Sequence, residues 1–309
     1  MVSALKKLIK EDPPDAIHVD YLSMVLYRPV FNRVPAVCFP HDAVSMLMER
    51  NAQAETNFLR CLYMRAQWKK TVKFEAEWLP RFECTAVVSP VDRDHLLRHC
   101  PGLDITVTPN GVDGDYFAPL PLPVEEPSVL FRGVMNFLPN HDAALHFYTH
   151  ILPKIRAEFP KTKFYLIGKN PSGFWLDQVQ KDPLLVAPGY VEDLRPWMAK
   201  AGVIVVPMRI GSGIKNKILE PMAMGKAVVA TPMSCAAIQA KNEENILLAE
   251  EPENFAGQVV RLLKDSGLRR RIGENARKFA VQNHSWERNA RQYEALYQKA
   301  VEKRNRLHG

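Results

Sequence analysis

The sequence predicts an α/β protein with two doubly wound parallel sheets. Short apolar strands alternate with helical patterns, and a segment rich in proline, glycine and aspartate divides that alternation in two. A Gly-Ser-Gly turn then connects a strand to a helix in the second part. Such alternation places helices on both faces of a parallel sheet. The 309 residues are enough for two domains with separate cores.

Four strands are expected in the first part, after an opening amphipathic helix that carries Leu5, Leu8 and Ile9. The longest helical pattern between the strands covers about residues 54–78. The strands are expected at residues 16–19, 36–39, 86–88 and 105–108. A doubly wound half usually has about five or six strands. This part therefore forms a small complete domain, or lacks its first βαβ units, or is completed by another chain.

Residues 109–127 read PNGVDGDYFAPLPLPVEEP, which predicts a turn followed by an interdomain linker. Domain boundaries follow from its position. We expect an N-terminal domain over 1–112, a linker over 113–127, a second domain over 128–285 and a terminal helix over 286–309 that packs back on the first domain.

Six further strands are expected after the linker, enough for a complete doubly wound domain. They are expected at residues 129–132, 164–167, 184–186, 203–206, 227–230 and 246–248. Helices are expected at residues 142–159, 175–180, 194–200, 216–224 and 255–264, followed by a charged helical tail over 268–307.

Composition and charge narrow the classes of function. Hydrophobic residues make up 47% of the chain and charged residues 24%, which is typical of a globular protein. No apolar run is long enough to span a bilayer, and the five cysteines have no C-x-x-C spacing. We expect a cytoplasmic protein with reduced thiols.

A net charge of +7 favours anionic partners, namely phosphorylated substrates or the surface of an anionic membrane. The chain has neither an RNP-like aromatic motif nor a zinc-finger spacing, so we expect no nucleic-acid partner.

The segment PMRIGSGIKNKILEPMAMGKAVVA, residues 207–230, predicts an anion site. A glycine turn before a helix N-terminus directs backbone N–H groups and the helix dipole at one point. Lysine and arginine oppose that dipole unless an anion is present. We expect Arg209 and Lys217 to contact a diphosphate and Glu220 to lie further along the helix. The turn itself would be supplied by Gly211, Ser212 and Gly213.

Several motifs in order resemble those of the family-4 glycosyltransferases of the GT-B fold. They are DAIHVD at 15–20, TAVVSPVDRDHLL at 85–97, TPNGVDGDYFAP at 108–119, KILEPMAMGKAVVA at 217–230 and HSWE at 284–287. Four segments, HVDYLSM, GVMNFLPNHDA, GYVEDLRPWM and GIKNKILEPMAMG, are similar to sugar transferases of bacterial exopolysaccharide and PEP-CTERM/exosortase clusters.

The resemblance implies two Rossmann-like domains that face a cleft, with the N-terminal, acceptor-side domain incomplete. It implies a retaining, metal-independent transfer of a hexose from a nucleotide sugar to a saccharide or lipid-linked acceptor, without a cofactor. The process would be surface polysaccharide synthesis in the cytoplasm or at the inner membrane face.

The resemblance also assigns site residues. Glu220 would accept hydrogen bonds from the ribose hydroxyls, and Tyr190 and Val191 would cradle the base. His41 and Asp42 would lie at the reacting centre, where a neutral imidazole relays the proton of the acceptor.

Two positions depart from the family pattern. Ser212 stands where the family has a glutamate that contacts the donor sugar. Residues 131–140, FRGVMNFLPN, follow the first strand of the second domain, with Asn140 near the place of an expected lysine. Our hypothesis is that Arg209 and Lys217 replace this lost positive charge.

Two alternatives stay open at this point. The chain binds a nucleotide sugar with little activity unless a separate N-terminal chain completes it, or it is another GT-B enzyme such as a sugar epimerase. Donor binding without turnover would favour the first alternative, and release of a free epimer would favour the second.

Overall fold

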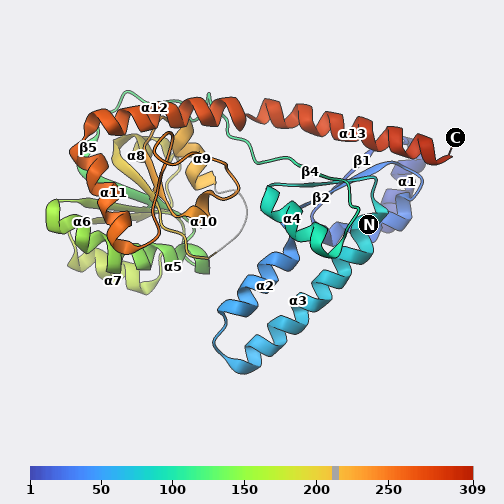
Figure 1. Ribbon diagram of the computed structural model, residues 1–309, viewed down its shortest axis with the longest axis horizontal. Coiled ribbons are helices and arrows are strands. Elements are labelled where there is room, and N and C mark those ends of the chain that lie inside the picture. The colour runs from blue at the N-terminus through green and yellow to red at the C-terminus, as the bar shows by residue number, and fades with distance from the viewer. Residues whose placement is uncertain (211–215, 309) are drawn as a thin grey trace. The chain divides into compact units, whose positions relative to one another are not determined.

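The computed structural model describes residues 1–210 and 216–308. They form two compact units, which Figure 1 shows as ribbons. Unit 1 consists of residues 1–109 together with the chain from residue 287 onward, and unit 2 consists of residues 110–286. In the described part of the chain, no helix is long and apolar enough to cross a membrane.

Unit 1 is built on a parallel sheet with the strand order β1-β2-β3-β4. The strands are β1 (Ile17–Asp20), β2 (Ala36–His41), β3 (Cys84–Val87) and β4 (Ile105–Val107). The helices are α1 (Val2–Glu11), α2 (Val44–Ala54), α3 (Phe58–Trp78), α4 (Pro90–His99) and α13 (Trp286–His308), with 3-10 segments η1 (Leu22–Phe31) and η2 (Leu79–Arg81). The four expected strands are confirmed within a few residues.

Helices α2 and α3 form an antiparallel hairpin that projects from the sheet of unit 1 (Figure 1). The connection is short, and Asn57 caps the N-terminus of α3: its side chain accepts a hydrogen bond from the Arg60 amide at 3.1 Å. At the base of the hairpin the buried Glu75 carboxylate accepts a hydrogen bond from the Ser45 amide at 3.0 Å. Its second oxygen lies 3.0 Å from Nε2 of His99, so α2, α3 and α4 are joined at one point.

Helix α13 completes unit 1 through buried apolar and ionic contacts. Leu296 and Ala300 are buried. A buried ion cluster joins this helix to the sheet: the Glu83 carboxylate lies 3.1 Å from the guanidinium of Arg28 and 3.1 Å from that of Arg304. Arg28 also donates to the carbonyl oxygens of three other residues, which satisfies most of its N–H groups.

We expect Glu83→Ala to lower the free energy of unfolding of unit 1 by about 3–5 kcal/mol, because it leaves two guanidinium groups without their carboxylate in a buried site. Urea unfolding followed by hydrogen exchange of β2 and β3 measures the effect. The matched control is Glu77→Ala, which removes an exposed ion pair with Arg81 and is expected to cost about 1 kcal/mol or less. Equal losses in the two variants would contradict the prediction.

Unit 2 is a six-stranded parallel sheet with the order β10-β9-β8-β5-β6-β7. The strands are β5 (Glu125–Arg132), β6 (Lys163–Ile167), β7 (Leu185–Gly189), β8 (Ala201–Val206), β9 (Val228–Ala230) and β10 (Leu247–Leu248). The helices are α5 (Leu138–His146), α6 (Leu152–Glu158), α7 (Gly173–Lys181), α8 (Arg195–Lys200), α9 (Asn216–Ala223), α10 (Pro232–Cys235), α11 (Pro252–Lys264) and α12 (Ser266–Asn283). All six expected strands are confirmed, and their order is that of a doubly wound sheet.

The single helix expected over residues 142–159 is interrupted in the structure. Helix α5 is followed by a π-helical segment, η3 (Phe147–Ile151), before α6 begins. Pro153 explains the interruption, because proline has no N–H to donate to the carbonyl one turn earlier. The wider turn still buries Phe147 and Ile151 against the sheet.

Candidate functional site

A cavity of about 470 Å³ lies at the carboxyl ends of β5, β6 and β7 in unit 2. Strand order reverses between β5 and β8, which are neighbours in the sheet. In open α/β sheets, ligands bind outside the carboxyl ends of the strands at such a point of reversal. The volume is within the range of small-molecule sites.

Two glycines allow the loops after β5 and β6 to meet at this cavity. A Cβ atom on Gly168 would lie 1.7 Å from the carbonyl oxygen of Gly133, and one on Gly133 would lie 2.6 Å from Cγ of Asn140. A side chain at Gly168 would therefore require the backbone to move, and one at Gly133 would displace the Asn140 side chain. This close approach brings the residues on either side, Arg132 and Lys169, to the same cavity.

Arg132 is the last residue of β5 and lines the cavity. One guanidinium nitrogen lies 2.5 Å from the Glu220 carboxylate of α9, and both side chains are largely buried. Burial raises the pKa of the Glu220 carboxyl, and the Arg132 charge opposes that rise. The Nε–H of Arg132 is buried and has no hydrogen-bond acceptor in the part of the chain that the structure describes.

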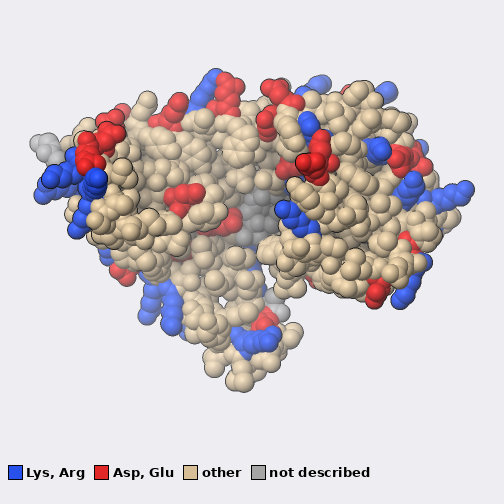
Figure 2. Space-filling model, turned by 180° about the vertical axis from the view of Figure 1, so that it is seen from behind, with Lys and Arg blue, Asp and Glu red and all other residues tan. Residues whose placement is uncertain are grey.

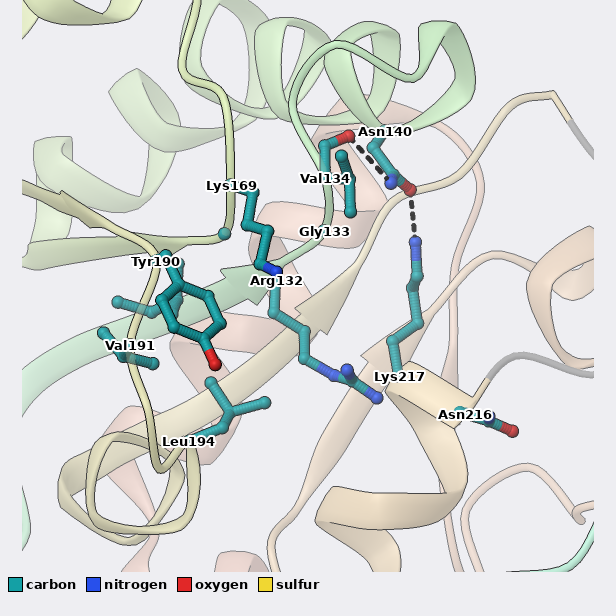
Figure 3. Close-up of a pocket in the computed structure, with 12 residues that line it drawn as sticks. Arg132, Gly133, Val134, Asn140, Lys169, Tyr190, Val191, Leu194, Asn216 and Lys217 are labelled. Atoms are coloured by element: carbon teal, nitrogen blue, oxygen red, sulfur yellow. Dashed lines mark hydrogen bonds between the residues drawn. The ribbon is translucent and has the colours of Figure 1, made fainter.

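Lys217 and Asn140 form the opposite side of the cavity. Nζ of Lys217 donates to Oδ1 of Asn140 at 2.5 Å, and Nδ2 of Asn140 donates to the Val134 carbonyl at 3.1 Å. Figure 3 shows these two hydrogen bonds, with the Arg132 side chain extending toward Lys217 in this view. The second bond fixes the amide, so its oxygen is the atom that faces the ammonium group.

Lys169 and Tyr190 occupy the third side. The ammonium group of Lys169 lies 4.3 Å from the centre of the Tyr190 ring, which is a cation–π contact. Tyr190 is 63% exposed, so its ring offers a stacking surface that a planar ligand can reach. Among the described lining residues the charged groups are Arg132, Lys169 and Lys217, all positive.

Unit 1 contains a second group of polar side chains, at the carboxyl ends of β1 and β2. Nε2 of His41 lies 2.6 Å from Oδ1 of Asp20. His41 has a φ of 67°, which is uncommon outside glycine, and its ring centre lies 4.6 Å from that of Tyr21. The His41 side chain is partly exposed, so a carboxylate-oriented imidazole is accessible from solvent.

A cavity of about 500 Å³ lies beside this pair within unit 1. Tyr21 and Pro40 line it from the strand ends, and Thr71 and Phe74 line it from α3. Tyr21 therefore contacts the His41 ring and also forms part of the wall of this largely apolar cavity.

Comparison with known families accounts for most of the chain. Residues 1–116 match the family described as Glycosyltransferase Family 4, and residues 126–265 match the family described as Glycosyl transferases group 1. Both matched families are glycosyltransferases, and the chain has the GT-B fold. Its two parallel-sheet α/β units are those of the GT-B fold, as the sequence predicts.

Several known proteins are similar to this GT-B chain. An uncharacterized glycosyltransferase of Methanocaldococcus jannaschii is 30% identical over 93 residues, which is 29% of this chain and 24% of that protein. Sucrose-phosphate synthase from Thermosynechococcus elongatus has the same fold, with a TM-score of 0.76, 21% identity, and coverage of 96% of this chain and 76% of that one. Anabaena HepE in complex with UDP gives a TM-score of 0.74 at 16% identity, covering 96% and 81%. The chain spans 24–52% of the length of the curated relatives that it matches.

The structure gathers some of the expected GT-B site residues and separates others. Lys217, Tyr190 and Val191 line the large cavity of unit 2, and Glu220 is joined to it through Arg132. Gly211, Ser212 and Gly213 lie outside the described residues. In unit 1, Asp42 follows His41 directly, and its amide donates to the Pro40 carbonyl at 3.0 Å.

Arg209 is not among the described residues that line the large cavity. Its guanidinium lies 2.6 Å from the Asp142 carboxylate, and it lines a separate cavity of about 280 Å³ with His146 and Met208. The role of Arg209 at the diphosphate stays a prediction, and Arg132 and Lys169 also supply positive charge to the large cavity.

Arg132, Lys169 and Asp20 are the residues that sequence reasoning missed. The sequence did contain a sign of both cations. Arg132 ends an apolar strand, and Lys169 follows a glycine directly after the next strand. Asp20 stands in the DAIHVD motif, but its partner His41 is 21 residues away.

Proposed function

We propose that this chain transfers a hexosyl group from a nucleotide-diphosphate sugar to a hydroxyl of a saccharide or lipid-linked acceptor. The observation that carries the proposal is the cavity of unit 2, with three cations at the point where strand order reverses. One of these cations, Arg132, presents a buried Nε–H that has no acceptor among the described residues.

The charges of this cavity suit a diphosphate. A buried N–H without an acceptor costs about 1–3 kcal/mol, and a phosphate oxygen would recover that cost. The ammonium groups of Lys169 and Lys217 add two further donors at the rim. Glu220 would accept the ribose hydroxyls, while Tyr190 and Val191 would contact the base.

The same charges would assist the reaction. Negative charge accumulates on the departing diphosphate in the transition state, so fixed cations stabilise the transition state more than the ground state. We propose that this stabilisation replaces a metal ion and that the anomeric configuration is retained. The described residues contain no group of three histidine, cysteine or acidic side chains arranged as a metal site.

The proposed proton acceptor is His41. Asp20 lies 2.6 Å from its Nε2 and would hold the ring in one orientation and stabilise the imidazolium that forms. The apolar cavity next to Tyr21 would take part of the acceptor. The four segments similar to exopolysaccharide-associated transferases support a role in surface polysaccharide synthesis in the cytoplasm.

Calorimetric titration with UDP, GDP and ADP tests the donor site. We expect Lys217→Ala to weaken binding of the preferred nucleotide about 10- to 100-fold, because a charge-assisted hydrogen bond contributes about 1.5–3 kcal/mol. Arg261→Ala is the matched control, since its exposed guanidinium pairs with Glu243 and does not line the cavity. Its expected change is less than about threefold.

Unchanged binding in Lys217→Ala, or an equal loss in Arg261→Ala, would overturn the assignment of the donor cavity. Turnover is measured in parallel as nucleoside diphosphate release from the matching nucleotide sugar in the presence of saccharide acceptors. Binding without any turnover would favour a nucleotide-sugar-binding protein over an enzyme.

A further inference from the structure

The end of the α2–α3 hairpin exposes an unusual group of large apolar side chains. Phe58 is 80% exposed, Leu59 74%, Leu62 60% and Tyr63 65%. With 3.6 residues per turn, these four side chains lie within about 140° of one another on α3. They form a continuous apolar surface over the first turns of the helix, away from the face that packs on α2.

Cations continue the same face toward the base of the hairpin. Arg65, Lys69 and Lys73 are exposed; Lys69 and Lys73 fall within the angular range of the apolar group, and Arg65 lies about 20° outside it. None of the three forms an ion pair with a described residue. Residues 44–73, which make up most of the hairpin, contain six lysines or arginines and two glutamates. Figure 2 shows lysine and arginine side chains along this projection.

We propose that the α2–α3 hairpin docks on the surface of an anionic lipid bilayer. The apolar group, Phe58, Leu59, Leu62 and Tyr63, inserts below the headgroups, and Arg65, Lys69 and Lys73 contact the lipid phosphates. This inference goes beyond the proposed sugar transfer and does not depend on it.

The order of side chains along α3 matches the depth profile of a membrane surface. At 1.5 Å per residue, Lys69 lies about 10 Å along the helix from Leu62. An interfacial helix buries its apolar face about 5–10 Å into the boundary between headgroups and acyl chains. When the apolar group is inserted to that depth, Lys69 lies at the level of the phosphates, and the long side chains of Arg65 and Lys73 extend toward that level from either side.

Residue types also favour lipid over a protein partner. Lysine is depleted in protein–protein interfaces relative to the rest of the surface, whereas clusters of lysine and arginine beside an apolar surface are typical of binding to anionic lipid. The two carboxylates of the segment, Glu49 and Glu55, precede α3 in the chain. Helix α3 itself contains no acidic residue before Glu75.

Vesicle sedimentation tests the proposal with the full chain and without donor or acceptor, so its outcome is independent of the proposed sugar transfer. We expect binding to vesicles that mix phosphatidylglycerol with phosphatidylcholine, weakening as ionic strength rises. The triple variant Arg65→Gln/Lys69→Gln/Lys73→Gln should lower the partition coefficient about 100-fold. Each cation contributes about 1 kcal/mol, which is about a fivefold change, and the three factors multiply. Phe58→Ser/Leu62→Ser should lower it about tenfold or more.

The matched control carries one apolar and one basic substitution on α7 of unit 2, Leu176→Ser/Lys181→Gln. Both side chains are exposed there, and we expect the partition coefficient to stay unchanged. All variants should keep the thermal unfolding curve of the parent chain, because the altered side chains are exposed.

A second measurement reports insertion directly. The Phe58→Trp variant should gain fluorescence that brominated acyl chains quench in phosphatidylglycerol vesicles. Three results would overturn the proposal: equal binding to phosphatidylcholine alone, unchanged binding by both hairpin variants, or a concentration-dependent dimer in solution that the Phe58→Ser/Leu62→Ser variant abolishes. The last result would show that a second copy of the chain covers this face.

Discussion

Replacing His41 with alanine is expected to lower kcat by about 10²–10⁴, the usual contribution of a positioned acid or base. The nucleotide Kd should not change, because the cations proposed to hold the diphosphate belong to unit 2, whereas His41 belongs to unit 1. Kinetics of nucleoside diphosphate release, together with calorimetry on the same samples, separate the two quantities.

Asp20→Asn refines this prediction. The asparagine keeps the contact with Nε2 of His41 but cannot stabilise an imidazolium by charge, so a smaller loss of kcat and a changed pH profile are expected. The control is His150→Ala, an exposed histidine of unit 2. An unchanged kcat in His41→Ala would exclude His41 as the proton acceptor.

Arg132→Met is expected to weaken nucleotide binding about 100-fold. It removes a cation from the donor cavity and leaves the largely buried Glu220 carboxyl without its ion partner, a change that costs about 3–5 kcal/mol in buried pairs. Arg132 lowers the pKa of Glu220 against the effect of burial, so the variant should raise that pKa further above its ordinary value.

The pH dependence of the nucleotide Kd tests this coupling. Ionised Glu220 is the form that accepts hydrogen bonds from both ribose hydroxyls, so affinity should be complete above the raised pKa and should fall as the pH drops through it. In Arg132→Met the fall should begin at a higher pH. In Glu220→Gln it should disappear, because glutamine does not titrate. A pH profile shared by all three proteins would contradict the assigned role of Glu220.

The strands of both sheets could be predicted from the sequence because each is a short apolar run bounded by turn residues. In unit 2 this is clearest for β8 (Ala201–Val206), which is buried along its whole length. The hairpin was harder to predict. Its first helix, α2, packs along α3, and the sequence indicated only the second helix.

The candidate site was predicted only in part, because its residues come together through strand order. Lys217, Tyr190 and Val191 belong to motifs that can be recognised along the chain. Arg132 and Lys169 become site residues only when Gly133 and Gly168 bring two loops into contact. Arg209 is a different case: its ion pair with Asp142 of α5 could not be predicted from the motif, because the two residues are 67 positions apart.

Helix α13 has a consequence for how the protein is made. Residues 1–109 of unit 1 are translated before unit 2, but Arg304, which contacts Glu83 in the interior of unit 1, is translated after unit 2. During synthesis, residues 1–109 therefore emerge from the ribosome before α13 is available. Until then they expose the surface that Leu296 and Ala300 of α13 later cover. Chaperones that shield nascent chains would act at this stage, and unit 2 would be the first to mature.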